Sequence, residues 1–190
     1  MSSTTNNMLT KNYRGKVGKQ YVMKTRGDKS IIASLPKRRD PGVPVPPNML
    51  QLQKKFQRAS IYARMSNTNP DLMLQYADGR RGNQTAFNVA FLDAYKGPEV
   101  GDLRADAYKG QPGQPLFIEA IDNFRVTSVR FTLIAPDGSI LEEGDAQMDE
   151  TTGYDWIYTT QVANPSLTGT TIRVVAEDLP KNRAFFEAVL

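Results

Sequence analysis

The sequence predicts an α+β protein in which an N-terminal β-hairpin arm and a small helical unit precede an immunoglobulin-like antiparallel β-sandwich. Three observations lead to this prediction. Two short β-prone runs precede a proline-rich segment, apolar residues then recur every three or four positions, and the apolar period shortens to two after Pro98. We therefore divide the chain into an arm with a proline-rich strap (1–47), a three-helix unit (48–98) and a sandwich (99–190).

The arm follows a polar stretch, residues 1–12, and contains two β-prone runs, QYVMKTR and KSIIASL. Gly27 and Asp28 between them can adopt the positive φ of a tight hairpin turn. A lone two-stranded hairpin is marginally stable in water, so we expect this one to lean on another surface. The four prolines between residues 41 and 47 fix φ and withhold donors, which predicts an extended, stiff strap over residues 40–47.

Helical spacing begins at Asn48, a suitable N-cap residue. In TNPDLMLQYADG, Asn69 can cap a second helix, Pro70 suits its first position and Gly79 can end it. A third helix is predicted in NQTAFNVAFLDAYKGP. One face of the first helix consists of Met49, Leu52, Phe56, Ala59 and Ala63. The expected core of the unit is Phe56, Leu72, Leu74, Phe87 and Phe91.

After Pro98 the chain alternates between short β-prone runs and explicit turn sequences such as PDGS and NPSLTG. In VTSVRFTLIA, Val129, Phe131 and Leu133 alternate with more polar residues, as in a strand with one buried face. We place seven strands at residues 102–108, 115–121, 126–135, 139–146, 155–161, 170–178 and 183–190. Seven strands at this spacing are typical of an immunoglobulin-like sandwich, with Trp156 in its core.

Composition argues against catalysis. The chain has no Cys and no His, so it lacks thiolate chemistry, the usual general base near neutral pH and the commonest zinc ligand. We expect a non-enzymatic protein without a cofactor or a metal. Five acidic residues lie close together between positions 142 and 150, but their spacing does not match an EF-hand, and we interpret them as solvated carboxylates. These residues are Glu142, Glu143, Asp145, Asp149 and Glu150.

Charge is distributed unevenly along the chain. Residues 1–81 carry 16 Lys and Arg against 4 Asp and Glu, a net charge of +12, whereas residues 82–190 carry 8 against 16, a net charge of −8. A chain with this dipole suits either an acidic partner or copies of itself joined head to tail. The basic half, with Tyr13 and Tyr21 available for stacking, also suits DNA or RNA, although no recognition motif accompanies it.

These features favour a structural subunit that self-assembles, or docks into a filament, sheath or phage-like particle, through its N-terminal arm. The alternative is an accessory protein that binds nucleic acid with its basic half. In the first hypothesis, apolar anchors and a basic run on the arm contact a neighbouring copy or a larger protein assembly. The predicted docking residues are Tyr21, Val22, Ile31, Ile32, Leu35, Lys37, Arg38 and Arg39.

The order of these parts resembles a group of small uncharacterised proteins of Bacteroidota. The resemblance rests on GKVG at residues 15–18, LPK at 35–37, KFQRASIY at 55–62, and IDNFRVTSVRFTLIAPDGSILEEG with NPSLTGTTIRVVAED. It covers nearly the whole chain and implies a basic N-terminal hairpin, a helical stretch and an Ig-like region, with no established activity. The C-terminal segment is also similar to Ig-like modules on structural proteins of bacteria and their phages.

No apolar run approaches the roughly 20 residues that a membrane-spanning helix needs, and the N-terminus lacks the apolar core of a secretory signal. We therefore expect a protein of the cytoplasm, or of a particle assembled there.

Overall fold

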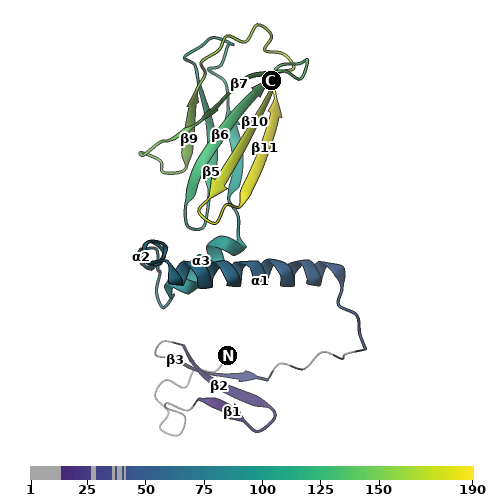
Figure 1. Cartoon of the computed structure of the whole chain (residues 1–190), viewed down its shortest axis with the longest axis vertical. Coiled ribbons are helices and arrows are strands. Elements are labelled where there is room, and N and C mark those ends of the chain that lie inside the picture. The colour runs from purple at the N-terminus through teal and green to yellow at the C-terminus, as the bar shows by residue number, and fades with distance from the viewer. Residues whose placement is uncertain (1–13, 27–28, 36, 38–39, 41) are drawn as a thin grey trace. The chain divides into compact units, whose positions relative to one another are not determined.

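The computed structural model describes residues 14–26, 29–35, 37, 40 and 42–190, which contain three helices and eleven strands in three antiparallel sheets (Figure 1). The predicted α+β class is confirmed. The chain divides into two compact units, Met1–Gln53 with Arg80–Gln84, and Lys54–Gly79 with Thr85–Leu190. The finer division at residues 47 and 98 stays a prediction. Among the described residues, no helix combines the length and the apolar character needed to cross a membrane.

The first unit contains an antiparallel sheet of three strands, β1 (Gly15–Val17), β2 (Tyr21–Arg26) and β3 (Lys29–Ser34), which we call the arm sheet. The two predicted strands are confirmed, and the predicted turn at Gly27 and Asp28 lies outside the described residues. Sequence reasoning missed β1, which is only three residues long. Gly18 begins the connection from β1 to β2 with φ +60°, a conformation that favours glycine. The third strand gives the hairpin the added pairing that independent stability needs.

The strap is not extended throughout, so this prediction is wrong at its start. Asp40 closes a turn, because its carbonyl accepts from the Val43 amide at 3.1 Å and its side chain accepts from the Gly42 amide at 3.0 Å. Pro47 is the first residue of α1 (Pro47–Thr68), so the predicted N-cap at Asn48 is also wrong. Proline suits this position because its φ is already helical and its missing N–H would have no partner there.

The second and third helices are α2 (Pro70–Asp78) and α3 (Ala86–Tyr95). The predicted start and end of α2 are confirmed. The Asn69 side chain accepts from the Asp71 amide at 3.0 Å and from the Leu72 amide at 3.3 Å, and Gly79 follows the last residue of α2. Thr85 caps α3 by accepting from the Asn88 amide at 3.2 Å. Each cap satisfies amides that the first turn of a helix leaves without partners.

The helical core differs from the predicted one. Its centre is Tyr76, which is completely buried, whereas Phe56 and Leu74, both expected in the core, are 58% and 64% exposed. Small residues of α1 permit the close packing: Ala59, Ser60, Ala63 and Ser66. The predicted Leu72, Phe87 and Phe91 pack around this core, together with Phe124 and Leu179 from two turns of the sandwich. Helices and sandwich turns therefore share one apolar cluster.

The sandwich has two sheets of four strands, ordered β4-β5-β9-β8 and β11-β10-β6-β7. This is the immunoglobulin order with one added edge strand. The first sheet comprises β4 (Glu99–Arg104), β5 (Pro115–Ile121), β8 (Gln147–Met148) and β9 (Asp155–Thr159). The second comprises β6 (Val126–Ile134), β7 (Ile140–Asp145), β10 (Thr171–Asp178) and β11 (Arg183–Val189). Trp156 is buried in the core between the sheets, as predicted.

The first sandwich strand begins earlier than predicted. It occupies Glu99–Arg104 rather than residues 102–108, and its pairing with β5 is irregular between Gly101 and Arg104. Asp102 lies in this irregularity with φ +51°, a bulge that the alternation rule does not anticipate. Tyr108, expected in the strand, lies in a following turn and is nevertheless buried in the sandwich core.

Candidate functional site

The register of the arm sheet distributes its side chains over two faces. Val17 pairs with Tyr21, which pairs with Ser34, and Met23 pairs with Ile32. Because directly paired residues share a face and alternate residues return to it, these positions lie on the same side. The described positions on this side are all uncharged: Gly15, Val17, Tyr21, Met23, Thr25, Ser30, Ile32 and Ser34.

The apolar residues of this side, Val17, Tyr21, Met23 and Ile32, form what we call the apolar arm face. Val17 is 45% exposed, Tyr21 48% and Ile32 37%. Large apolar side chains grouped on one face and left this open are typical of contact surfaces. The predicted anchors Tyr21 and Ile32 belong to this face.

The opposite side, the basic arm face, combines charge with smaller apolar residues: Lys16, Val22, Lys24, Ile31 and Ala33. The predicted anchors Val22 and Ile31 are half-buried on this side, so the predicted apolar anchors of the two strands do not form one patch. Leu35 is half-buried and its amide donates to the Gln20 carbonyl at 2.9 Å. Lys37 is exposed, and Arg38 and Arg39 lie outside the described residues.

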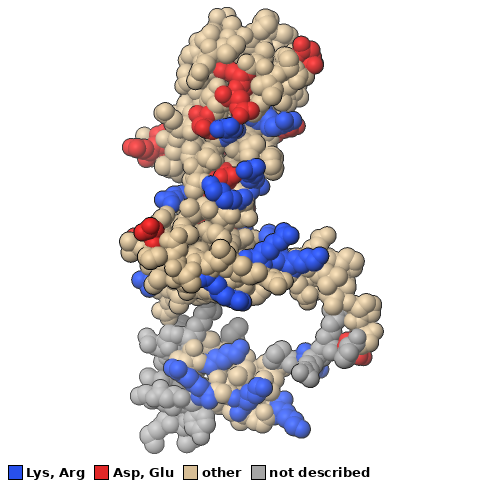
Figure 2. All heavy atoms as spheres, viewed as in Figure 1, with Lys and Arg blue, Asp and Glu red and all other residues tan. Residues whose placement is uncertain are grey.

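Positive charge in the arm is uncompensated where the structure describes it. Arg14, Lys16, Lys19, Lys24 and Lys37 are exposed, and the described ion pairs all lie in the sandwich. In the face drawn in Figure 2, Lys and Arg gather over the arm sheet and along α1, whereas the sandwich shows Asp and Glu beside Lys and Arg. The charge asymmetry of the sequence is thus present on the surface.

The outer face of the sandwich has a shallow hollow on strands β4 and β5, lined by Glu99, Val100, Gly101, Glu119 and Ile121. Glu99 pairs in register with Ile121, and Gly101 pairs with Glu119. The space above Gly101 is open, because a Cβ added there would meet no atom within 4 Å. Neither glutamate belongs to any ion pair among the described residues, so the hollow combines two uncompensated carboxylates with the half-exposed Ile121.

Three of the five residues of the acidic stretch predicted to be solvated are exposed, and Asp149 is half-buried. Glu143 and Asp145 are exposed and both pair with Arg130 at 2.8 Å, and Glu150 is exposed. Glu142, however, is buried, so the prediction is wrong for this residue. Its Oε2 accepts from the Tyr158 hydroxyl at 3.0 Å and from the amides of Gln161 and Val162 at 2.7 and 3.2 Å. Glu142 thus ties β7 to the end of β9.

Sequence reasoning missed a second group of carboxylates. Asp93 of α3, Asp122 after β5 and Asp178 at the end of β10 each offer an oxygen, and these oxygens all lie within 4.8 Å of one another. Asp93 and Asp178 are completely buried. We call these three residues the aspartate cluster. It is the one group of this kind among the described residues.

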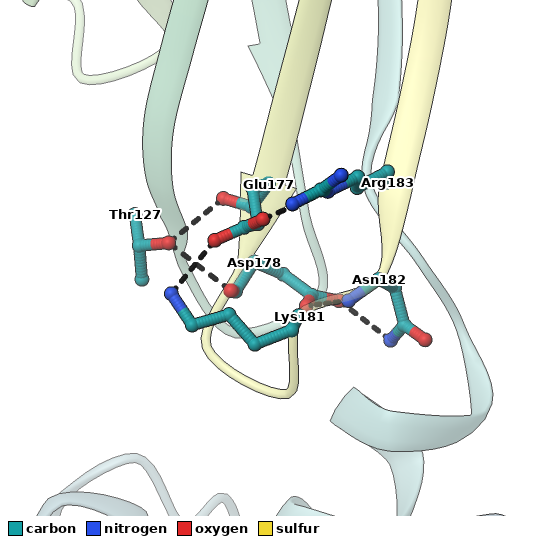
Figure 3. A network of polar contacts seen from close by, with 6 residues as sticks. All are labelled: Thr127, Glu177, Asp178, Lys181, Asn182 and Arg183. Carbon is teal, nitrogen blue, oxygen red and sulfur yellow. Dashed lines mark hydrogen bonds and ion pairs between the residues drawn. The ribbon is translucent and has the colours of Figure 1, made fainter.

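Each aspartate is held by its own local contacts. The Tyr76 hydroxyl donates to Asp93 Oδ2 at 2.5 Å, and Asp122 Oδ2 accepts from the amides of Phe124 and Arg125. Asp178 accepts from the Asn182 amide at 2.6 Å and from its side chain at 2.7 Å, in the β10–β11 turn drawn in Figure 3. The contacts leave Asp93 Oδ1 and Asp122 Oδ1 buried without a hydrogen-bond partner.

Burial dominates the electrostatics of the aspartate cluster. Loss of solvation raises the pKa of Asp93 to about 8; the Tyr76 hydroxyl opposes this rise, and Asp122 and Asp178 add to it. Burial also raises the pKa of Asp178, against the hydrogen bonds from Asn182. The pKa of Tyr76 is raised for the same reason, so its hydroxyl stays a donor. A proton or another cation is therefore needed to offset these charges.

No protein-family model matches the chain, and no curated protein matches it either. The arm sheet, the β4–β5 hollow and the aspartate cluster are the features of the chain that indicate a function.

Proposed function

We propose that this protein is a non-enzymatic structural subunit whose arm sheet docks onto the sandwich of a second copy. The observation that carries the proposal is the apolar arm face, on which Val17, Tyr21 and Ile32 remain between about a third and a half exposed. Such a face gains stability when another surface covers it.

Charge favours a second copy of the chain as the occupant. Residues 1–81 carry a net charge of +12 and residues 82–190 a net charge of −8, so the arm of one copy complements the sandwich of another. The β4–β5 hollow is the acceptor we assign, because Glu99 and Glu119 have no described cation partner and Ile121 adds apolar surface. Arg14, whose Nε donates to Thr25 on the apolar side at 3.2 Å, and the exposed Lys19, in the turn between Val17 and Tyr21, would supply the missing charges.

A contact between two different surfaces of the same chain is heterologous, so it closes into a ring or propagates as a filament. The geometry thus supports assembly with a direction. The hydrophobic contribution to this contact can be estimated, because burying the exposed half of one side chain of the apolar arm face contributes about 1 kcal/mol.

The experiment measures the mass of the nuclease-treated, full-length protein by light scattering at moderate salt. The expected result is a mass above that of the monomer, in a peak whose ultraviolet absorbance ratio is that of pure protein. Tyr21→Thr combined with Ile32→Thr should weaken association by about 10- to 100-fold, the equivalent of about 1.4–2.7 kcal/mol. Ile140→Thr, which alters an apolar residue of the sandwich that is 63% exposed and lies outside both proposed surfaces, is the control.

Charge exchange tests the partner surfaces. Arg14→Glu with Lys19→Glu should abolish association, and adding Glu99→Lys with Glu119→Lys in the same chain should restore it. A protein that is monomeric at every concentration refutes assembly. Association that survives the arm variants, or that the exchanged charges fail to restore, refutes this pair of surfaces.

Nucleic-acid binding is the second candidate, and α1 is the observation in its favour. This helix contains Lys54, Lys55, Arg58 and Arg64 and no acidic residue. Binding of this kind predicts co-purifying nucleic acid and an affinity that falls steeply between low and moderate salt. A clean assembly whose mass is unchanged by nuclease distinguishes the first proposal from this one.

A further inference from the structure

We propose that the aspartate cluster is a binding site for a hard divalent cation, with Ca²⁺ as the preferred ion, which fastens α3 to two turns of the sandwich. The proposal is independent of assembly, because all three aspartates lie within one unit of one chain. It starts from the two carboxylate oxygens that have no hydrogen-bond partner.

Asp93 provides the strongest reason to expect a ligand. Its side chain is completely buried, yet its Oδ1 has no partner among the protein atoms, and Asp122 Oδ1 beside it has none either. A buried carboxylate oxygen without a donor is costly, and two of them facing a third carboxylate are costlier. A cation shared by the three carboxylates would offset the cost of both unpartnered oxygens.

The basic side chains on the two sandwich turns do not supply that positive charge. On the β10–β11 turn, Lys181 and Arg183 both pair with Glu177, as Figure 3 shows. On the β5–β6 turn, Arg125 donates to Gln75 at 2.6 Å. The basic side chains of both turns are thus engaged elsewhere.

Size and chemistry select the ion. All of the ligand atoms are carboxylate oxygens, which suit hard cations. The three oxygens lie within 4.8 Å of one another, a span that one cation with oxygens at about 2.3–2.6 Å, the range of Ca²⁺, can bridge. Mg²⁺ usually keeps several of its waters, which a site with Asp93 and Asp178 completely buried disfavours.

The surrounding contacts keep the ligands in place. Tyr76 orients Asp93 from α2, its ring packs on Phe124 with centroids 4.7 Å apart, and Phe124 follows Asp122 in the same turn. Asn182 donates from the other turn both to Asp178 and, at 3.3 Å, to the main-chain carbonyl of Asp93. Outer contacts of this kind fix the orientation of metal ligands.

The test uses the full-length protein, freed of metals with a chelator that is then removed, and Tb³⁺ as a luminescent substitute for Ca²⁺. Tyr76 touches the site, so excitation of tyrosine should sensitise bound Tb³⁺, and Ca²⁺ should displace it. Thermal unfolding in Ca²⁺ and in chelator supplies a second readout, because an ion that binds only the folded state raises the melting temperature.

Asp93→Asn and Asp122→Asn should each weaken binding at least about tenfold and remove the effect of Ca²⁺ on unfolding. Glu150→Gln, which neutralises an exposed carboxylate of the sandwich, should change neither. The proposal is overturned if neither readout responds to Ca²⁺, since Asp93 and Asp122 then share a proton instead. It is equally overturned if Glu150→Gln and Asp93→Asn bind alike, or if Mg²⁺ binds more tightly than Ca²⁺.

Discussion

Replacing Tyr76 by Phe tests the buried network that joins α1, α2 and α3. Tyr76 is completely buried, and its hydroxyl lies 2.5 Å from Asp93 Oδ2 and 2.8 Å from the Tyr62 hydroxyl. Phenylalanine keeps the ring, and therefore its packing on Phe124, but removes both hydrogen bonds. The change thus isolates the polar contribution of one oxygen atom.

The two losses can be sized separately. Leaving Asp93 Oδ2 without its donor costs about 1–3 kcal/mol, and losing the bond between two hydroxyls costs about 0.5–1.5 kcal/mol. We expect Tyr76→Phe to lower the free energy of unfolding by about 2–4 kcal/mol. Tyr62→Phe removes only the second bond and should cost about 0.5–1.5 kcal/mol. The double variant should be no less stable than Tyr76→Phe alone, because the Tyr62 hydroxyl has then already lost this partner.

Urea unfolding followed by tryptophan fluorescence measures these differences. Trp156 is the sole tryptophan of the chain and lies in the same unit as the network, so its signal reports on that unit. With a urea dependence of about 2–3 kcal/mol per molar, the midpoint of Tyr76→Phe should fall by about 1 M. If Tyr76→Phe costs no more than Tyr62→Phe, the bond to Asp93 does not contribute and the reasoning is wrong.

Two further predictions concern buried positions of the same unit. The pKa of Asp93 rises from 3.8 to about 8 on folding, so between these pH values the folded state keeps a proton that the unfolded state releases. The stability that this proton provides is therefore lost as the pH rises from 3.8 to about 8. In the presence of a chelator, the free energy of unfolding of the wild-type protein, measured with urea, should fall by up to about 1.4 kcal/mol per pH unit relative to that of Asp93→Asn. The titratable groups that face Asp93 are Asp122 and Asp178. Parallel pH profiles of the two proteins would contradict this prediction. Gly144→Ala should destabilise the sandwich by about 1–3 kcal/mol, since a Cβ there would lie 2.6 Å from Tyr158. Gly101→Ala, with no atom within 4 Å of the added Cβ, is the control and should be neutral in the same assay.

Sequence patterns predict the sandwich well because one face of each strand is buried. The boundaries of β5, β6 and β10 agree with the period-two runs to within one residue. The pattern fails where a bulge interrupts the alternation, as at Asp102, or where a strand is very short, as in β1. Caps were predictable for α2 because Asn69, Pro70 and Gly79 each act locally.

The arm residues could be chosen from the sequence, but their arrangement could not. Tyr21 and Val22 are neighbours in sequence and therefore point to opposite faces of a strand. Only the register shows that Tyr21 joins Val17 and Ile32, whereas Val22 joins Lys16. The apolar arm face thus depends on β1, the strand that sequence reasoning missed.

Two of the three residues of the aspartate cluster occupy positions that the sequence pattern assigns to the core. In β10, Ile172, Val174 and Ala176 point into the core, and the same alternation places Asp178 there. In α3, Asp93 follows Val89 and Ala90 on the buried face. A carboxylate at a core position predicts a partner. The sequence does not show which groups are the partners, because the three aspartates belong to three separate elements that only the fold brings together.

Glu142 shows why an unpartnered oxygen is not enough to indicate a cation. Its Oε1 is also buried without a partner, but its Oε2 accepts from three donors. The negative charge of Glu142 is thereby met within the protein, and the side chain acts as a structural tie. Asp93 has a single side-chain donor and faces two further carboxylates instead of amides. The two buried acids therefore differ in what surrounds them, and only the surroundings of Asp93 call for a positive charge from solution.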